Sequence, residues 1–129
     1  MNKKMIAALI TSGLAAAVFS SNAHAASTPY SGTHTGYGAP HEKEFTLNSS
    51  AKVTVFGSQN ATEPEYTAIC YYSVYKKVPF WFDELVYDKG EIRGNNATVN
   101  FATSKLESGT YYLKFVCNTP SFTSGTISW

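Results

Sequence analysis

The sequence predicts an all-β protein: an antiparallel two-sheet β-sandwich of jelly-roll-like form, with about seven strands and one disulfide. Beyond the N-terminal leader, apolar and polar residues alternate in short runs, and clusters of Gly, Pro, Asn and Ser separate these runs. Aromatic residues make up 15% of the chain, mostly Tyr and Phe, which favour strands. The alternation gives each strand one apolar face, which is typical of antiparallel sheets packed on a core.

Seven runs carry this pattern, and we expect strands at residues 45–47, 53–55, 66–75, 80–87, 97–102, 110–117 and 122–129. The polar segments 57–65 and 88–96 contain Gly, Asn or Pro and are predicted to be loops. In the fourth run, Phe80 and Phe82 share one face and Trp81 the other. We expect the two Phe rings to enter the core, because together they bury more apolar area than one Trp.

The N-terminus predicts export. Two lysines in Met1–Lys4 precede an apolar run over residues 5–19, and Ala23-His24-Ala25 follows as a small-x-small cleavage site. The apolar run is shorter than the roughly 20 residues of a membrane-spanning helix. We therefore expect a signal peptide cut after Ala25, no membrane anchor after cleavage, and a secreted, extracellular protein (or a periplasmic one in a Gram-negative host).

The predicted organisation has three parts: a cleaved signal peptide at residues 1–25, a flexible N-terminal arm at 26–43 and the β-sandwich at 44–129. The arm is rich in Ser, Thr, Gly and Pro, and it has few apolar residues to bury. Removal of the leader leaves eight basic and nine acidic residues. Without a basic stripe the chain is a poor candidate for binding nucleic acid, and we expect a monomer.

Cys70 and Cys117 are the only two cysteines. In an oxidising compartment such a pair becomes a structural disulfide. The alternative, a reactive or metal-binding pair, lacks the close spacing of the usual motifs. The bridge would close a long loop, and the chain-entropy model then assigns it on the order of 4 kcal/mol of stability.

Part of the strand order resembles a known family, the bacterial pre-peptidase C-terminal domain, over about residues 44–129. The motif that carries the likeness is a leucine, a turn glycine and paired aromatics: Leu106, Gly109, Tyr111 and Tyr112. The runs Phe45-x-Leu47, Val53-x-Val55, Ala97-Thr98-Val99 and Gly125-Thr126-Ile127 follow the same order. The resemblance implies a jelly-roll-like sandwich from secreted bacterial hydrolases, with a non-catalytic accessory or binding role.

No catalytic constellation is evident, and we expect no enzyme. The chain has no G-x-S-x-G motif, and its neighbouring carboxylates Asp83 and Glu84 would point to opposite faces of a strand. His34 and His41 lack the spacing of a metal or acid–base motif. A small secreted hydrolase remains a minor alternative.

Asp83, Asp88 and Glu91 form the densest acidic group, and their oxygens are candidate Ca²⁺ ligands. We favour an ordinary solvated strand edge and loop, with Lys89 and Arg93 nearby to balance the charge, so we predict no metal and no cofactor.

The candidate ligand surface contains Trp81, with Tyr72 and Tyr112 as its neighbours. Exposed aromatic rings bind sugars or protein partners. The sequence therefore predicts a secreted, non-catalytic binding or surface-interaction module for an extracellular polymer or protein. The alternative is a secreted enzyme inhibitor or toxin-like effector that acts through loops 57–65 and 88–96.

Overall fold

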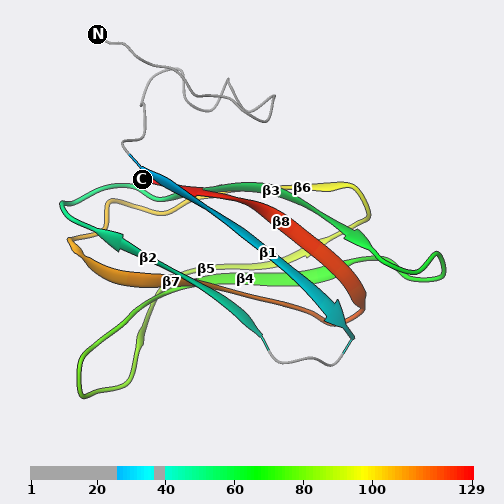
Figure 1. Cartoon of the computed structure of the whole chain (residues 1–129), viewed down its shortest axis with the longest axis horizontal. Coiled ribbons are helices and arrows are strands. Elements are labelled where there is room, and N and C mark those ends of the chain that lie inside the picture. Colours follow the sequence, from blue (N-terminus) through cyan, green and yellow to red (C-terminus); the bar gives the residue numbers. More distant parts are fainter. Residues whose placement is uncertain (1–25, 37–39) are drawn as a thin grey trace, which may run out of the picture.

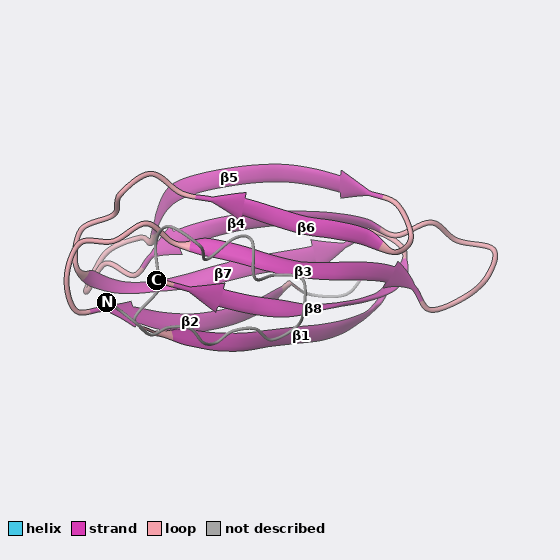
Figure 2. Cartoon of the chain, turned by 90° about the horizontal axis from the view of Figure 1, so that it is seen from above, coloured by secondary structure: helices cyan, strands magenta, loops and turns pink. Residues whose placement is uncertain are grey.

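The computed structural model describes residues 26–36 and 40–129, which form two four-stranded antiparallel sheets packed face to face (Figures 1 and 2). The eight strands are β1 (Ser27–Thr35), β2 (His41–Leu47), β3 (Thr54–Ala61), β4 (Ile69–Lys76), β5 (Glu84–Arg93), β6 (Ala97–Ala102), β7 (Gly109–Cys117) and β8 (Pro120–Ser128). One sheet has the order β1-β8-β3-β6 and the other β2-β7-β4-β5. This order is that of a jelly roll, so the predicted fold class is confirmed.

The predicted signal peptide, residues 1–25, lies outside the described residues. Within the described part of the chain, no helix is long and apolar enough to cross a membrane.

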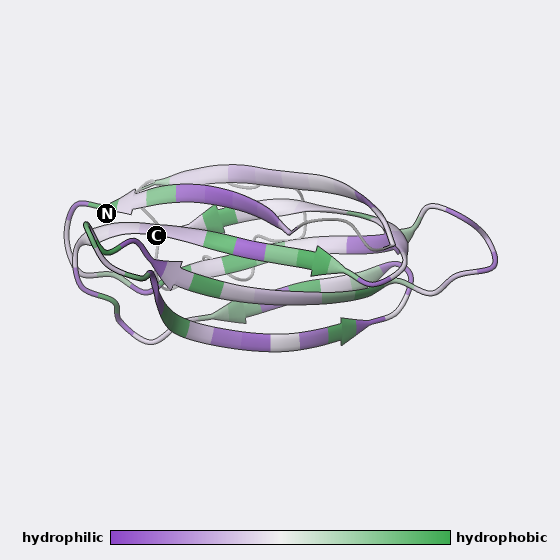
Figure 3. Cartoon of the chain, turned by 90° about the horizontal axis from the view of Figure 1, so that it is seen from below, coloured by the Kyte–Doolittle hydropathy of each residue, from purple (hydrophilic) through white to green (hydrophobic). Residues whose placement is uncertain are grey.

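The core lies between the sheets and is built mainly from alternate residues of the strands, as the apolar and polar bands in Figure 3 illustrate. β5 contributes only the partly buried Val86, Tyr87 and Ile92. In β7 the inward residues are Tyr111, Leu113, Phe115 and Cys117, as the sequence predicts. The remaining buried apolar side chains are Tyr30, Phe45, Leu47, Val53, Val55, Ala68, Cys70, Tyr72, Val74, Val99, Phe101, Leu106 and Ile127.

The prediction of a flexible N-terminal arm is wrong for residues 27–35 and 41–43, which lie in strands. Residues 27–35 form β1, which pairs with β8 along its whole length, and residues 41–43 begin β2. Tyr30 and His34 are only 3% and 2% exposed, because they lie at alternate positions that face inward. The arm therefore docks as an eighth strand, although its composition is typical of a loop.

Two glycines explain why β1 docks. Tyr30 is paired with Gly125 of β8, which is paired in turn with Gly57 of β3. A Cβ atom added to Gly125 would lie 2.8 Å from the Tyr30 ring, and one added to Gly57 would lie 2.7 Å from the Tyr30 hydroxyl. The ring thus fills the space that these glycines leave open, and its burial helps to hold β1 on the sheet.

The predicted loops 57–65 and 88–96 are also largely wrong, because β3 extends to Ala61 and β5 extends to Arg93. The polar Gln59 faces inward and is accommodated because its amide donates a 2.8 Å hydrogen bond to the Ile92 carbonyl. In β5, Gly90 has φ of 79° and lies beside a register shift opposite Tyr72 and Ser73. This glycine marks a bulge within a strand rather than a loop.

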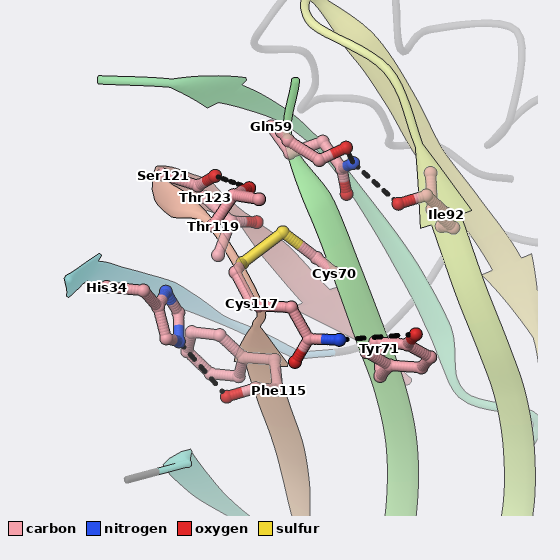
Figure 4. The surroundings of a disulfide bond; sticks show 12 residues. His34, Gln59, Cys70, Tyr71, Ile92, Phe115, Cys117, Thr119, Ser121 and Thr123 are labelled. Atoms are coloured by element: carbon pink, nitrogen blue, oxygen red, sulfur yellow. Dashed lines mark hydrogen bonds between the residues drawn. A yellow bond between two sulfur atoms is a disulfide. The ribbon is translucent and has the colours of Figure 1, made fainter. Parts of the chain in front are cut away.

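The predicted disulfide is confirmed. Cys70 of β4 and Cys117 of β7 are register partners on neighbouring strands, with Cα atoms 4.0 Å apart. Both are fully buried, and Figure 4 shows the bridge between the strands with Phe115 and Thr119 nearby. The bond thus links two adjacent strands on the inward face of one sheet.

Candidate functional site: an exposed aromatic loop

The connection between β4 and β5 carries three consecutive aromatic residues into solvent. We call residues 77–83 the aromatic loop; in Figure 1 it is the green loop that projects below the sheets at the lower left. Phe80, Trp81 and Phe82 are 104%, 75% and 81% exposed. Trp81 and Phe82 contact each other edge to face, with ring centroids 5.8 Å apart. The loop therefore presents a large apolar surface, of the kind that marks an interaction site on soluble proteins.

The predicted strand at 80–87 begins only at Glu84, so the inward orientation of Phe80 and Phe82 is wrong. Pro79 cannot donate to a sheet ladder, and Phe80 has φ of 60°, which takes the chain out of a strand conformation. The predicted outward position of Trp81 is confirmed, although it comes from the loop and not from alternation along a strand.

Hydrogen bonds hold the base of the aromatic loop. The Lys77 amide donates to the Thr110 carbonyl at 2.9 Å, and the Trp81 amide donates to the Val78 carbonyl at 3.3 Å. The Val78 amide donates to a carboxylate oxygen of Asp83 at 3.4 Å, which joins the two ends of the loop. The loop is thus a turn whose base is fixed by hydrogen bonds and whose apolar side chains are exposed to solvent.

Tyr112 connects the loop to the sheet. Its hydroxyl donates to the second carboxylate oxygen of Asp83 at 2.9 Å, and its ring stacks on Tyr75 with centroids 5.4 Å apart. Burial and the nearby Asp83 carboxylate raise the pKa of Tyr112 to about 12, so the hydroxyl stays protonated and able to donate at neutral pH. Tyr112, a predicted ligand residue, therefore positions the loop and is itself buried.

Tyr72, the third predicted ligand residue, lies in the core and not on a binding surface. It is 1% exposed, and its hydroxyl donates to Gln59 Oε1 at 3.0 Å and lies 2.7 Å from the Thr123 hydroxyl. Even residues of β4 face inward, so Tyr72 belongs with Cys70 and Val74. The prediction that Tyr72 binds ligand is therefore wrong.

Three charged side chains near the aromatic loop, Lys76, Lys77 and Asp83, have partners within the protein. Lys76 contacts Glu107 at 2.7 Å, and Lys77 lies 3.6 Å from Glu44. The Asp83 carboxylate is occupied by the Tyr112 hydroxyl. These three charged groups are therefore occupied by partners within the protein.

The three candidate Ca²⁺ ligands, Asp83, Asp88 and Glu91, each contact a different partner within the protein. Asp83 accepts from Tyr112, Asp88 accepts from the Gly90 amide at 3.0 Å, and Glu91 contacts Arg93 at 3.0 Å. Residues 26–36 and 40–129 contain no group of three or more His, Cys, Asp or Glu side chains that could hold a metal ion. The geometry therefore brings no Ca²⁺ cluster together from these residues.

His34 and His41 lie side by side, although the sequence showed no motif for this. Their ring centroids are 4.4 Å apart across β1 and β2. His34 is buried, its Nε2 lies 3.4 Å from the Phe115 carbonyl, and its Nδ1 has no hydrogen-bond partner within the described residues (Figure 4). His41 borders a half-open pocket of about 300 Å³ between β1 and β2.

Among the described residues, the aromatic loop carries the three most exposed large hydrophobic side chains. Sequence reasoning missed Phe80 and Phe82 as surface residues. The available signal was Val78-Pro79 directly before them, because a proline at that point ends the preceding strand.

No family model and no curated protein matches the sequence. Among solved structures, the chain is similar to the Yersinia pseudotuberculosis-derived mitogen YPM, with a TM-score of 0.42 and 13% sequence identity. The match covers 80% of this chain and 83% of the other. A likeness at this level carries no argument about function.

Proposed function

We propose that this chain is an exported, non-catalytic binding module that attaches to an extracellular surface through its aromatic loop. The observation that carries the proposal is the exposure of Phe80, Trp81 and Phe82 on a loop whose base is fixed by Asp83. Exposing three large rings to water is unfavourable, and their burial against a target would recover that free energy. A fixed backbone also lowers the entropy that binding must cost.

Two further observations support export and a binding role. The buried bridge between Cys70 and Cys117 is typical of proteins from oxidising compartments, in agreement with the signal peptide predicted at the N-terminus. The resemblance to the pre-peptidase C-terminal domain suggests an accessory role without catalysis. We retain that family assignment as part of the proposal.

The test uses protein purified from the exported fraction and a variant that replaces all three rings, Phe80→Ser/Trp81→Ser/Phe82→Ser. Both are incubated with intact cells, cell-wall material and insoluble polysaccharides, and the retained protein is measured. Phe122→Ser is the matched control, because Phe122 is also an exposed aromatic residue but lies on β8 of the other sheet. We expect the native protein and the control to be retained on the same material, and the triple variant to be lost.

Equal retention of the triple variant, with its melting temperature unchanged, would contradict a role for the aromatic loop. Loop-dependent capture of one soluble enzyme, without retention on any surface, would favour the inhibitor alternative.

A further inference from the structure

We infer that the surface which the aromatic loop binds is a lipid bilayer, into which Phe80, Trp81 and Phe82 insert. This inference rests on the proposed function and names the class of its target. It concerns a reversible contact of a folded domain and requires no spanning segment.

The arrangement of the rings favours a target that surrounds the loop. Phe80 is as exposed as a side chain in an extended peptide, and Trp81 and Phe82 meet edge to face with 72° between their planes. The rings therefore form no flat platform on which a sugar could stack. A fluid apolar phase contacts all three rings, whatever their direction, whereas a rigid pocket would have to match each of them.

The chemistry of the loop tip also suits lipid. Phe80 and Phe82 have no hydrogen-bonding group on their side chains, and Trp is enriched at membrane–water interfaces because its indole is amphipathic. Polysaccharide binding depends on hydrogen bonds to hydroxyl groups as well as on stacking, and these three side chains offer one donor among them. An apolar phase therefore fits the tip better than a sugar polymer does.

The backbone amides at the base of the loop are hydrogen-bonded within the protein. An unpaired amide in a bilayer is costly, and this is the main barrier to inserting a loop. Here the amides of Lys77, Val78 and Trp81 are hydrogen-bonded within the protein, and Pro79 has no amide hydrogen. The Phe80 and Phe82 amides have no such partner within the described residues, so the loop should insert only as deep as the headgroup region, where water and lipid oxygens accept from these amides.

The charged residues at the base of the loop indicate whether binding requires anionic lipid headgroups. Lys76 and Lys77 are paired with Glu107 and Glu44, so these two lysines form no free basic cluster beside the loop. Binding should therefore need no anionic lipid and should change little with salt, unlike attachment by a polybasic patch.

The experiment adds phosphatidylcholine vesicles to exported protein carrying Trp129→Phe, which leaves Trp81 as the only tryptophan. We expect a blue shift of Trp81 emission, quenching by lipids with brominated acyl chains, and co-flotation with the vesicles. Each of Phe80→Ser and Phe82→Ser in this background should lower the partition coefficient by about tenfold or more, since each ring buries its area in lipid. Trp81→Ser in the native background should lower co-flotation similarly, whereas Phe122→Ser should leave it unchanged.

The other outcomes separate the two proposals. Loop-dependent retention on a polysaccharide or protein, without co-flotation with vesicles, would overturn the bilayer inference and leave the binding role intact. Binding that requires phosphatidylglycerol and is lost at high salt would also overturn it. Failure of the triple variant to change binding to any material, vesicles included, would overturn both.

Discussion

β1 buries its tyrosine in the core, whereas the aromatic loop exposes its three aromatic side chains to solvent. β1 consists of Ser, Thr, Gly and Pro with one histidine and one tyrosine, and that tyrosine is buried beneath the paired glycines of β8 and β3. The aromatic loop is the most aromatic stretch of the chain, and its three rings lie in water. The two regions show that the density of aromatic residues does not decide which of them enter the core.

Two physical conditions decide burial in this fold. Tyr30 occupies an inward position in a paired strand, and the facing Gly57 and Gly125 leave space for its ring. Phe80 and Phe82 lie after the end of β4 at Lys76 and directly beyond Pro79, which cannot donate to a ladder, so no strand pairing fixes them toward the core. A side chain is therefore buried where register and a complementary space coincide, whatever the composition around it.

The largest loss of stability is expected for a substitution of the buried Tyr30. Tyr30→Ala should lower the free energy of unfolding by about 3–5 kcal/mol, because it removes a buried ring and leaves a cavity against Phe115, whose ring centroid lies 5.2 Å away. Chemical denaturation measures the loss. Tyr30→Phe is the matched control and should be close to neutral, since the Tyr30 hydroxyl has no partner within the described residues. A Tyr30→Ala variant as stable as the native protein would mean that β1 is dispensable.

A second substitution tests whether the space above Gly125 is needed for the Tyr30 ring. Gly125→Ala should cost about 1–3 kcal/mol, because the added methyl would overlap the Tyr30 ring and the backbone of β3. Combining Gly125→Ala with Tyr30→Ala should cost less than the sum of the two, since removal of the ring relieves part of the overlap. Strict additivity in this double-mutant cycle would contradict the proposed fit between ring and glycines.

Much of the fold could be predicted from the sequence. Alternation in β7 and β4 placed Leu113, Phe115 and Val74 correctly in the core, and the two cysteines bridged as expected. Prediction failed where polar residues face inward. Gln59 is buried because carbonyls of distant segments accept its amide protons, and no local pattern reveals those partners.

The candidate site was less predictable than the fold. The exposure of Trp81 was correctly predicted, but Tyr72 and Tyr112 were placed on the same surface from composition alone. The structure separates them, because Tyr72 points to Thr123 inside the core and Tyr112 points to Asp83 at the loop base. These pairings join residues 29 or more positions apart, so local spacing cannot supply them.

A smaller, pH-dependent effect distinguishes β1 further. Burial lowers the pKa of His34 from its ordinary value of 6.5. Below pH 6.5 the unfolded chain therefore takes up a proton that the folded chain refuses, and stability should fall as the pH drops toward the lowered pKa. Denaturation midpoints measured from neutral pH downward should show this slope, and His34→Gln should flatten it. His41→Gln is the control, because His41 is less buried, and it should retain most of the slope. A slope that disappears equally in both variants would assign the effect to the pair and not to His34.

The smallest expected effect on stability is at Trp81, the counterpart of Tyr30. Trp81→Ala should change the free energy of unfolding by no more than about 0.5 kcal/mol, because the ring touches little besides the exposed Phe82 and leaves no cavity. Chemical denaturation beside Tyr30→Ala gives the comparison directly. Without vesicles, Trp81 emission in the Trp129→Phe background should lie at the wavelength of solvated indole and be readily quenched by iodide. A loss above about 1 kcal/mol, or emission resistant to iodide, would mean that the loop folds its rings onto the sheet beside Tyr75 and Tyr112. In that case the exposed apolar surface that carries the proposed binding role would be largely lost.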